Sequence, residues 1–286
     1  MVDVFMDSGT AEMYRFEAMG IQLVETIIAR AGLTGSGTSN PRMRVIGPDF
    51  DYRESSLMFA GRVGRGPLRV AMDTNLLIDY FEHGHAMWAG ESVAKAHVGE
   101  YGEHLEALQL ILAVWVLRDI EFVMLKESLR DSKRRKLAPH LDKRNRKAWM
   151  EFYSALTHSP HYSADRADAA QRLHPRLVDR VIEAVPAGGD QRLVRAALND
   201  GAHVYLTRDK GVVRASAQLR AVGLSVMTAG DLLEALSLYG ALNFLGDPTS
   251  LYWPLPDQEK VAHVIWALPK REEPPEDGGH DVGELP

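Results

Sequence analysis

The sequence contains no cysteine among its 286 residues. This excludes disulfide bonds, cysteine-ligated zinc sites and thiol nucleophiles, and it does not indicate a compartment. Long apolar runs are also missing: the most apolar segment, LQLILAVWVL at 108–117, is far shorter than the ~20 residues of a membrane span and predicts a buried helix. The first 16 residues lack the basic start and continuous apolar stretch of a signal peptide. We therefore expect a cytoplasmic protein without a membrane segment.

Three common site motifs are missing or incomplete. The glycine cluster GRVGRGP before residue 68 lacks the GK[ST] ending of a phosphate-binding P-loop. Asp73 is followed by Thr-Asn-Leu, so the second aspartate of the D-x-D-x-T motif of haloacid-dehalogenase-like phosphatases is absent. His83 and His85 have a spacing that can share a zinc ion, but a third ligand is not evident, and a surface loop after a helix is expected there.

The chain has the composition of a globular protein, with 45% hydrophobic and 25% charged residues. Within 68–239, apolar strands alternate with helical patterns, which predicts an α/β fold of three layers, with a parallel sheet of four to five strands flanked by helices. The expected strands are 68–72, 120–125, 203–207 and 224–227. The main expected helices are 74–82, one or two within 86–118, 165–184, 191–200, 210–221 and 230–239.

Two extensions flank this domain. Residues 1–67 combine an amphipathic helix at 11–31 with a flexible linker, GLTGSGTSNP, at 32–41. Residues 240–286 form a C-terminal extension that is rich in proline. Its last part, from about 270, holds six acidic and two basic residues, a composition that predicts disorder.

The net charge of −6 argues against a nucleic-acid partner, but the charge is unevenly distributed. Residues 126–147 carry ten basic and three acidic residues, a local balance of +7, whereas the remainder carries 23 basic and 36 acidic residues. This stretch is typical either of a track for phosphate groups or of a solvated helix face. The candidate contacts to phosphate groups are Lys126, Arg130, Lys133, Arg134 and Arg135, with Arg208 from a later loop.

Four acidic residues stand where a strand ends or a helix begins. Asp73, Glu127 and Asp209 each follow an expected strand, and Asp190 opens a helix. Since the carboxyl ends of parallel strands meet at one edge of a sheet, these carboxylates are expected to converge there. Clustered carboxylates repel each other unless a cation neutralises them, and Mg²⁺ or Mn²⁺ suits oxygen ligands, which predicts a site for one or two ions. Phosphodiester hydrolysis is the chemistry that such a site most often supports.

Each acid also has a purely structural alternative. Asp73, Asp190 and Asp209 occupy positions where a helix N-cap is favoured, and Glu127 has the position of a first-turn acid. Asp79 is expected to be an ordinary surface acid.

Three segments resemble the PIN-domain nucleases, a family that includes many bacterial toxin-type ribonucleases. They are VAMDTNLLIDYF around Asp73, MLKESLR around Glu127 and GGDQRLVRAALNDGAHVYLTRDKGV, which runs from Asp190 through Asp209. The resemblance implies metal-dependent cleavage of RNA, with these four acids as metal ligands and catalytic residues. Thr74, Asn75 and Thr207 are the residues expected to orient the ligands by hydrogen bonds.

The resemblance covers residues 68 to about 239 and leaves several functions open. The chain departs from the compact toxins by a longer gap between Asp73 and Glu127 and by its two extensions. A toxin with an antitoxin partner and a stand-alone RNA-processing enzyme are both consistent with it, and homodimers are common in the family. The alternatives are a non-catalytic RNA- or protein-binding module and a structure-specific DNA nuclease.

Overall fold

The computed structural model describes the central part of the chain. The described residues are 57–60, 67–93, 97, 99–117, 120–128, 175–239 and 241, with the single residues 143, 147, 150, 156, 260 and 264. Several expectations therefore lie outside them. These are the helix at 11–31, the linker at 32–41, the acidic tail from 270, and the basic residues Arg130, Lys133, Arg134 and Arg135.

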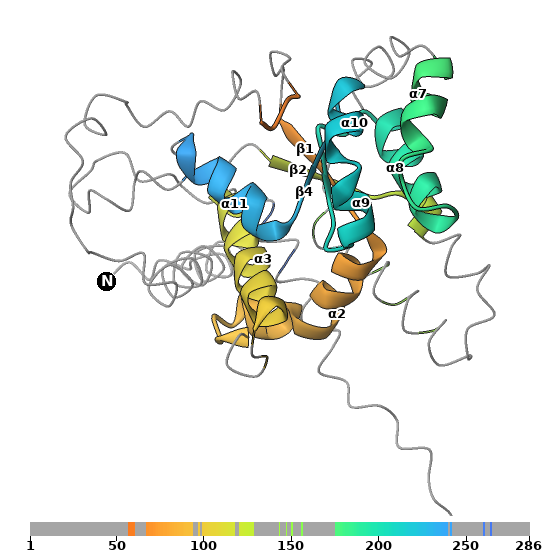
Figure 1. The fold of residues 1–286 in the computed structure, drawn as a ribbon. Helices are drawn as coiled ribbons and strands as arrows, with labels where there is room; N and C mark the ends of the chain where they lie inside the picture. Colours follow the sequence, from red (N-terminus) through yellow and green to blue (C-terminus); the bar gives the residue numbers. More distant parts are fainter. Residues whose placement is uncertain are drawn as a thin grey trace, which may run out of the picture.

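Four parallel strands form one sheet, and helices connect them (Figure 1). The strand order is β2-β1-β3-β4, and every neighbouring pair is parallel. The strands are β1 (Leu68–Met72), β2 (Ile120–Val123), β3 (Val204–Leu206) and β4 (Ser225–Met227). The described helices are α2 (Thr74–Trp88), α3 (Glu100–Leu117), α7 (Pro175–Ile182), α8 (Gly189–Asn199), α9 (Lys210–Arg214), α10 (Ser216–Ala221) and α11 (Ala229–Leu238). The predicted α/β fold with helices on both faces is confirmed.

Successive residues of each strand pack into different cores, one on each face of the sheet. Val70, Val204 and Leu206 belong to a core shared with α2, α3 and α11. Ala71 and Tyr205 belong to the opposite core, shared with α7, α8, α9 and α10. Side chains alternate between the faces of a strand, so a sheet covered on both sides requires apolar residues at nearly every strand position. Asp73, two residues beyond Ala71, follows β1 on the face of the second core.

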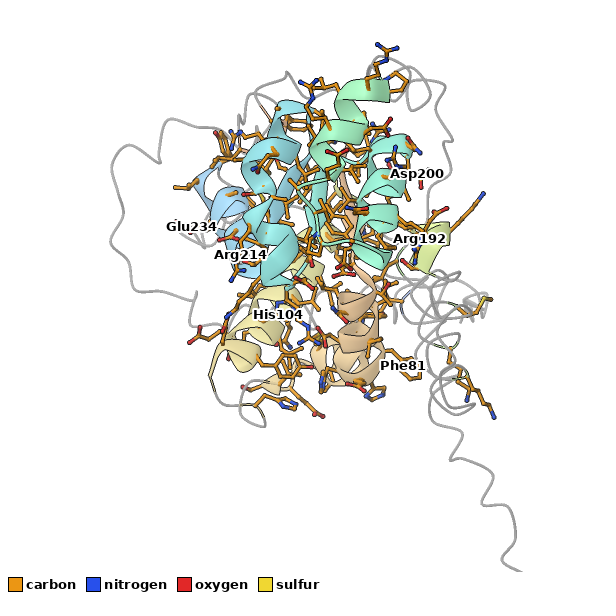
Figure 2. The ribbon with its side chains drawn as sticks, turned by 45° about the vertical axis from the view of Figure 1, so that its right-hand side comes forward. Phe81, His104, Arg192, Asp200, Arg214 and Glu234 are labelled. Atoms are coloured by element: carbon orange, nitrogen blue, oxygen red, sulfur yellow. The ribbon has the colours of Figure 1, made fainter. Side chains whose placement is uncertain are left out.

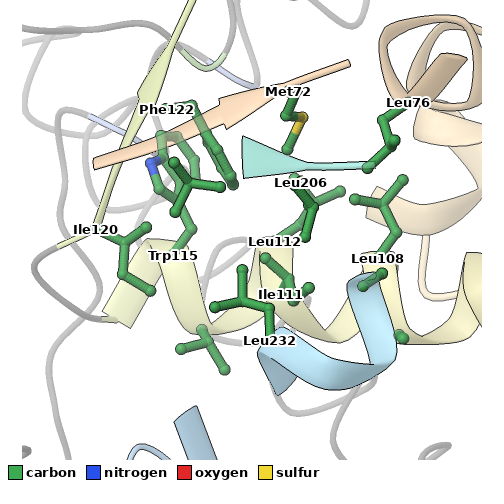
Figure 3. Packing of buried hydrophobic residues seen from close by; sticks show 14 of the residues in the cluster. Met72, Leu76, Leu108, Ile111, Leu112, Trp115, Ile120, Phe122, Leu206 and Leu232 are labelled. Carbon is green, nitrogen blue, oxygen red and sulfur yellow. The ribbon is translucent and has the colours of Figure 1, made fainter. Parts of the chain in front are cut away.

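The larger core is built around α3, whose apolar run was expected to form a buried helix. Figure 3 shows Leu108, Ile111, Leu112 and Trp115 of this helix packed beneath the strands. Trp115 lies against the ring of Phe122, with the ring centroids 5.7 Å apart. Among the helices that the structure describes, none is both long enough and apolar enough to cross a membrane.

Two helices differ from the sequence-based expectation. The first, α2, was expected to end near residue 82, but it continues to Trp88, so His83 and His85 lie within a helix and not in a loop. Gly84, inside the helix, allows the Tyr80 ring to pack closely, because an added Cβ would lie 3.0 Å from that ring. The expected helix at 210–221 is divided at Ala215 into α9 and α10.

Candidate functional site

Asp73 occupies the carboxyl end of β1, at the start of α2. Its backbone N–H donates to the carbonyl oxygen of Leu206 at 2.9 Å, which continues the pairing of β1 with β3 by one residue. Although Asp73 holds the N-cap position of α2, its side chain makes no capping hydrogen bond, and the residue is only 4% exposed. The capping alternative therefore does not explain this carboxylate, which is directed elsewhere.

Thr207, at the end of β3, holds the Asp73 carboxylate. Its Oγ1 donates a hydrogen bond to Asp73 Oδ2 at 2.7 Å and accepts one from the backbone N–H of Asp209 at 3.0 Å. Thr207 is completely buried, so water does not compete for these two bonds. One hydroxyl group thus fixes the distance between the end of β1 and the start of α9.

Asp209 caps α9 and also lies close to Asp73. Its Oδ1 accepts hydrogen bonds from the backbone N–H groups of Gly211 at 2.6 Å and Val212 at 3.3 Å, so the capping alternative applies here in part. The backbone of Gly211 lies so close to these groups that an added Cβ would be 2.9 Å from Asp209 Oδ1 and 2.7 Å from Pro186 Cγ. Glycine is therefore required sterically at this position.

Asp190 enters the site from the first turn of α8. The N-cap of that helix is Gly188, whose φ of 112° is readily available only to glycine. Burial raises the pKa of Asp73, and hydrogen bonds from Thr207 and the Thr74 backbone lower it. The carboxylates of Asp190 and Asp209 raise the pKa of Asp73 further, so both lie within electrostatic reach of Asp73.

Tyr205 is a site residue that the sequence analysis did not single out. It lies on β3 and is fully buried. No hydrogen bond of good geometry reaches its hydroxyl oxygen among the described residues, but the Asp73 carboxylate is close enough to interact with it. Burial raises the pKa of Tyr205 well above its usual value, and the charges of Asp73, Asp190 and Asp209 and a hydrogen-bonding interaction with Asp73 raise it further. The hydroxyl is therefore directed at the acids, where it can donate to a ligand or to water. Its place two residues before Thr207, on the same side of the strand, was the available sequence signal.

The remaining expected site residues lie at the same edge of the sheet. Glu127 is half-buried in the helical turn that follows β2, the strand next to β1. Thr74 Oγ1 is buried and finds no hydrogen-bond partner in the described part of the chain, whereas Asn75 is exposed. Lys126 is also exposed, so its ammonium group is accessible to a phosphate.

Asp79 was expected to be a surface acid, and this is wrong. Its side chain is 1% exposed, because α2 turns this face towards α3, and it forms an ion pair with Arg208 at 3.2 Å between Oδ2 and Nε. Arg208, predicted as a phosphate contact, is thus engaged by a buried carboxylate, although 42% of its side chain is still exposed.

The acids fit a divalent cation by their chemistry. The charges of Asp190 and Asp209 raise the pKa of the buried Asp73 carboxylate, and the buried Tyr205 hydroxyl lies within electrostatic reach of the same three acids. Within the described residues, no three His, Asp or Glu side chains form a ready-made metal cage. Mg²⁺ does not need one, because it usually keeps several water ligands and binds one or two carboxylates directly.

Removing the Thr207 hydroxyl should weaken the fold. Thr207→Val keeps the shape of the side chain but deprives a buried carboxylate and a backbone N–H of their partner, so the free energy of unfolding should fall by about 1–3 kcal/mol. Urea unfolding measures this value. Thr207→Ser, which retains the hydroxyl, is the control and should cost less. Equal losses in the two variants would contradict the hydrogen-bonding role.

The chain was compared with protein-family models, with curated proteins and with solved structures, and none of them matches it. Its function is therefore inferred from the arrangement of the acids at the ends of β1 and β3.

Proposed function

We propose that this protein is a metal-dependent nuclease that hydrolyses phosphodiester bonds of RNA. Its active site would consist of Asp73, Glu127, Asp190 and Asp209. The observation that carries the proposal is the grouping of Asp73, Asp190 and Asp209 around the Tyr205 hydroxyl, at the carboxyl edge of a parallel sheet. The resemblance of three segments to the PIN-domain nucleases supports the same function. Mg²⁺ or Mn²⁺, one or two ions, is the proposed cofactor.

The roles of the protein groups follow from their positions. Asp73 would be the central ligand, since Thr207 and the Thr74 backbone N–H orient its carboxylate. Asp190 and Asp209 would bind the cation directly or through water, and Glu127 would hold a second ion or orient the attacking water. The cation, when bound, lowers the pKa of a ligated water towards neutrality and stabilises charge on the phosphate.

Substrate contacts are proposed on both sides of the acids. Lys126 adjoins Glu127, and the exposed part of Arg208 adjoins Asp209, so both can neutralise phosphates next to the scissile bond. Cation groups in such positions give binding that weakens as salt is added. An antitoxin and a homodimeric partner are further proposals that follow from the family resemblance alone.

Cleavage of a structured RNA pool tests the proposal directly. With Mn²⁺ or Mg²⁺ the wild-type protein should produce RNA fragments, and EDTA should abolish them, because the proposed site depends on the cation to acidify the attacking water and to stabilise charge on the phosphate. A single-stranded DNA pool run in parallel separates RNA from DNA specificity. Absence of cleavage of either pool by folded, metal-loaded protein would contradict the nuclease proposal, and RNA retention without metal dependence would instead indicate a binding module.

A further inference from the structure

The carboxylate of Asp79 lies in a charged cluster between α2, α3 and the loop after β3. The Tyr101 hydroxyl donates a hydrogen bond to Oδ1 at 2.9 Å, and Arg208 Nε lies 3.2 Å from Oδ2. His104 Nε2 approaches Oδ2 to 3.3 Å, and Figure 2 shows His104 where α3 meets the lower end of α9 and α2. A carboxylate buried in this way is tolerated only when such partners replace its lost hydration.

Arg208 joins this cluster to the carboxylate site. It is the middle residue of the loop between β3 and α9, whose other two members are Thr207, which binds Asp73, and Asp209, which caps α9. Besides its ion pair with Asp79, the Arg208 guanidinium lies over the Tyr101 ring, 5.1 Å from its centroid. Consecutive residues of one loop are therefore anchored to β1, to α2 with α3, and to α9.

The proton of Tyr101 is directed to Asp79. Burial raises the pKa of Tyr101 to about 12, with the hydrogen bond and the charge of Asp79 as further causes, so the phenol stays protonated at neutral pH and remains a donor. His83 Nε2 lies 3.3 Å from the same hydroxyl and can donate to its oxygen. The groups that contact Asp79 thus come from two segments far apart in the sequence, α3 and the loop after β3, and His83 of α2 contacts one of them.

We propose that Asp79 is a positioning residue: through Arg208 and Tyr101 it fixes the loop Thr207–Asp209 and thereby holds Asp209 at its distance from Asp73. That Asp79 positions a nuclease site rests on the proposed function. That Asp79 anchors the loop rests only on the contacts of Asp79 with Arg208 and Tyr101. If Asp79 only stabilised the packing of α2 on α3, its loss would lower global stability without loosening this loop selectively.

Amide hydrogen exchange distinguishes the two roles. In Asp79→Asn, the backbone N–H groups of Asp209 and Gly211 should exchange ~10-fold faster or more, because they depend on the loop geometry. The Ser225 N–H, which pairs with His203 at the opposite end of β3, should be unchanged. Glu100→Gln is the matched control, since it removes an ion pair with Lys210 at 2.9 Å whose side chains are 79% and 71% exposed.

A second variant and a second measurement complete the test. Arg208→Gln should loosen the same amides, and its effect should not add to that of Asp79→Asn if the two residues act as a pair. The affinity for Mn²⁺, measured by calorimetry, should fall several-fold in both variants, with Glu100→Gln unchanged. Tyrosine absorbance titration should show a lower pKa for Tyr101 in Asp79→Asn, assigned by comparison with Tyr101→Phe.

The outcomes separate this inference from the proposed function. Faster exchange confined to the loop, with weaker Mn²⁺ binding, would support the positioning role. Wild-type exchange rates at the loop amides in both Asp79→Asn and Arg208→Gln would overturn it, even if the wild-type protein proves to be a nuclease. A wild-type protein that neither binds Mn²⁺ nor cleaves RNA would overturn the proposed function, and the exchange rates would still decide whether Asp79 anchors the loop.

Discussion

Asp73→Asn is expected to reduce RNA cleavage by roughly 10³–10⁴-fold, the scale at which loss of one member disables a group of catalytic residues that act together. Asparagine keeps the size of the side chain and can still accept the hydrogen bond from Thr207, so the fold should persist. The amide has no charge to offer a cation, and both metal binding and the activation of water should suffer. Cleavage rates at saturating Mn²⁺ measure the effect.

Without metal, Asp73→Asn should be more stable than the wild type at neutral pH, although it loses activity. Burial raises the pKa of Asp73 above its ordinary value of 3.8, so the folded protein holds this proton more tightly than the unfolded chain does. The resulting stability is fully present below about pH 4 and is lost as the pH rises through the raised pKa. Asparagine does not titrate, so with EDTA present the wild type should lose stability relative to Asp73→Asn as the pH increases.

Controls make the result of this substitution specific. Asp231→Asn alters an acid that belongs to the N-terminal capping box of α11, and cleavage should be unaffected. Adding Mn²⁺ should stabilise the wild type and leave Asp73→Asn unchanged, since binding to the native state alone raises stability. Asp73→Asn protein with wild-type cleavage would contradict the assignment of Asp73 as the central ligand.

Trp115→Ala is expected to lower the free energy of unfolding by about 3–5 kcal/mol, the range for truncating a large buried aromatic side chain. Trp115 is 1% exposed and packs between the rings of Trp88 and Phe122. Lys260 also lies over its ring, with Nζ 5.1 Å from the centroid, and donates to its backbone carbonyl at 2.9 Å. Figure 3 shows that the indole lies where α3 passes under the strands, so its loss leaves a cavity in the larger core.

Urea unfolding followed by circular dichroism measures the effect of Trp115→Ala. Trp115→Phe retains most of the ring contacts and should cost less, while Leu238→Ala, at a side chain that is 70% exposed, should have almost no effect. A loss below about 1 kcal/mol in Trp115→Ala would show that the core rearranges to fill the space.

The strands and their order of appearance could be predicted from the sequence, because each is a short, mostly apolar run, and three of the four are followed at once by a polar residue. Asp73 and Asp209 could be placed at strand ends for the same reason. Asp73 directly follows its apolar run, and Asp209 is separated from its run by two residues. The alternation of strands and helices along the sequence predicted the three-layer architecture, and the structure has this architecture.

Directions of side chains at helix and loop positions could not be predicted in the same way. Asp79 is one charged residue in the apolar segment LLIDYF, and only the packing of α2 against α3 shows that it is buried. The two faces of β3 are both apolar, so residue type did not mark Tyr205, and only its spacing of two residues from Thr207 pointed to the face with the acids. Arg208 lies between two site residues, yet its side chain reaches α2, a segment about 130 positions earlier in the chain.

The hydrogen bond between Thr207 and Asp73 joins residues 134 positions apart, and β3 inserts between β1 and β4. During synthesis on the ribosome, β1 and β2 emerge long before the strand that completes the arrangement of acids. A nascent chain that ends between residues 190 and 207 contains Asp73, Glu127 and Asp190, but it lacks Asp209 and the hydroxyl that orients Asp73. Any activity of this site must therefore appear late in translation, and prematurely terminated products of that length should be inert.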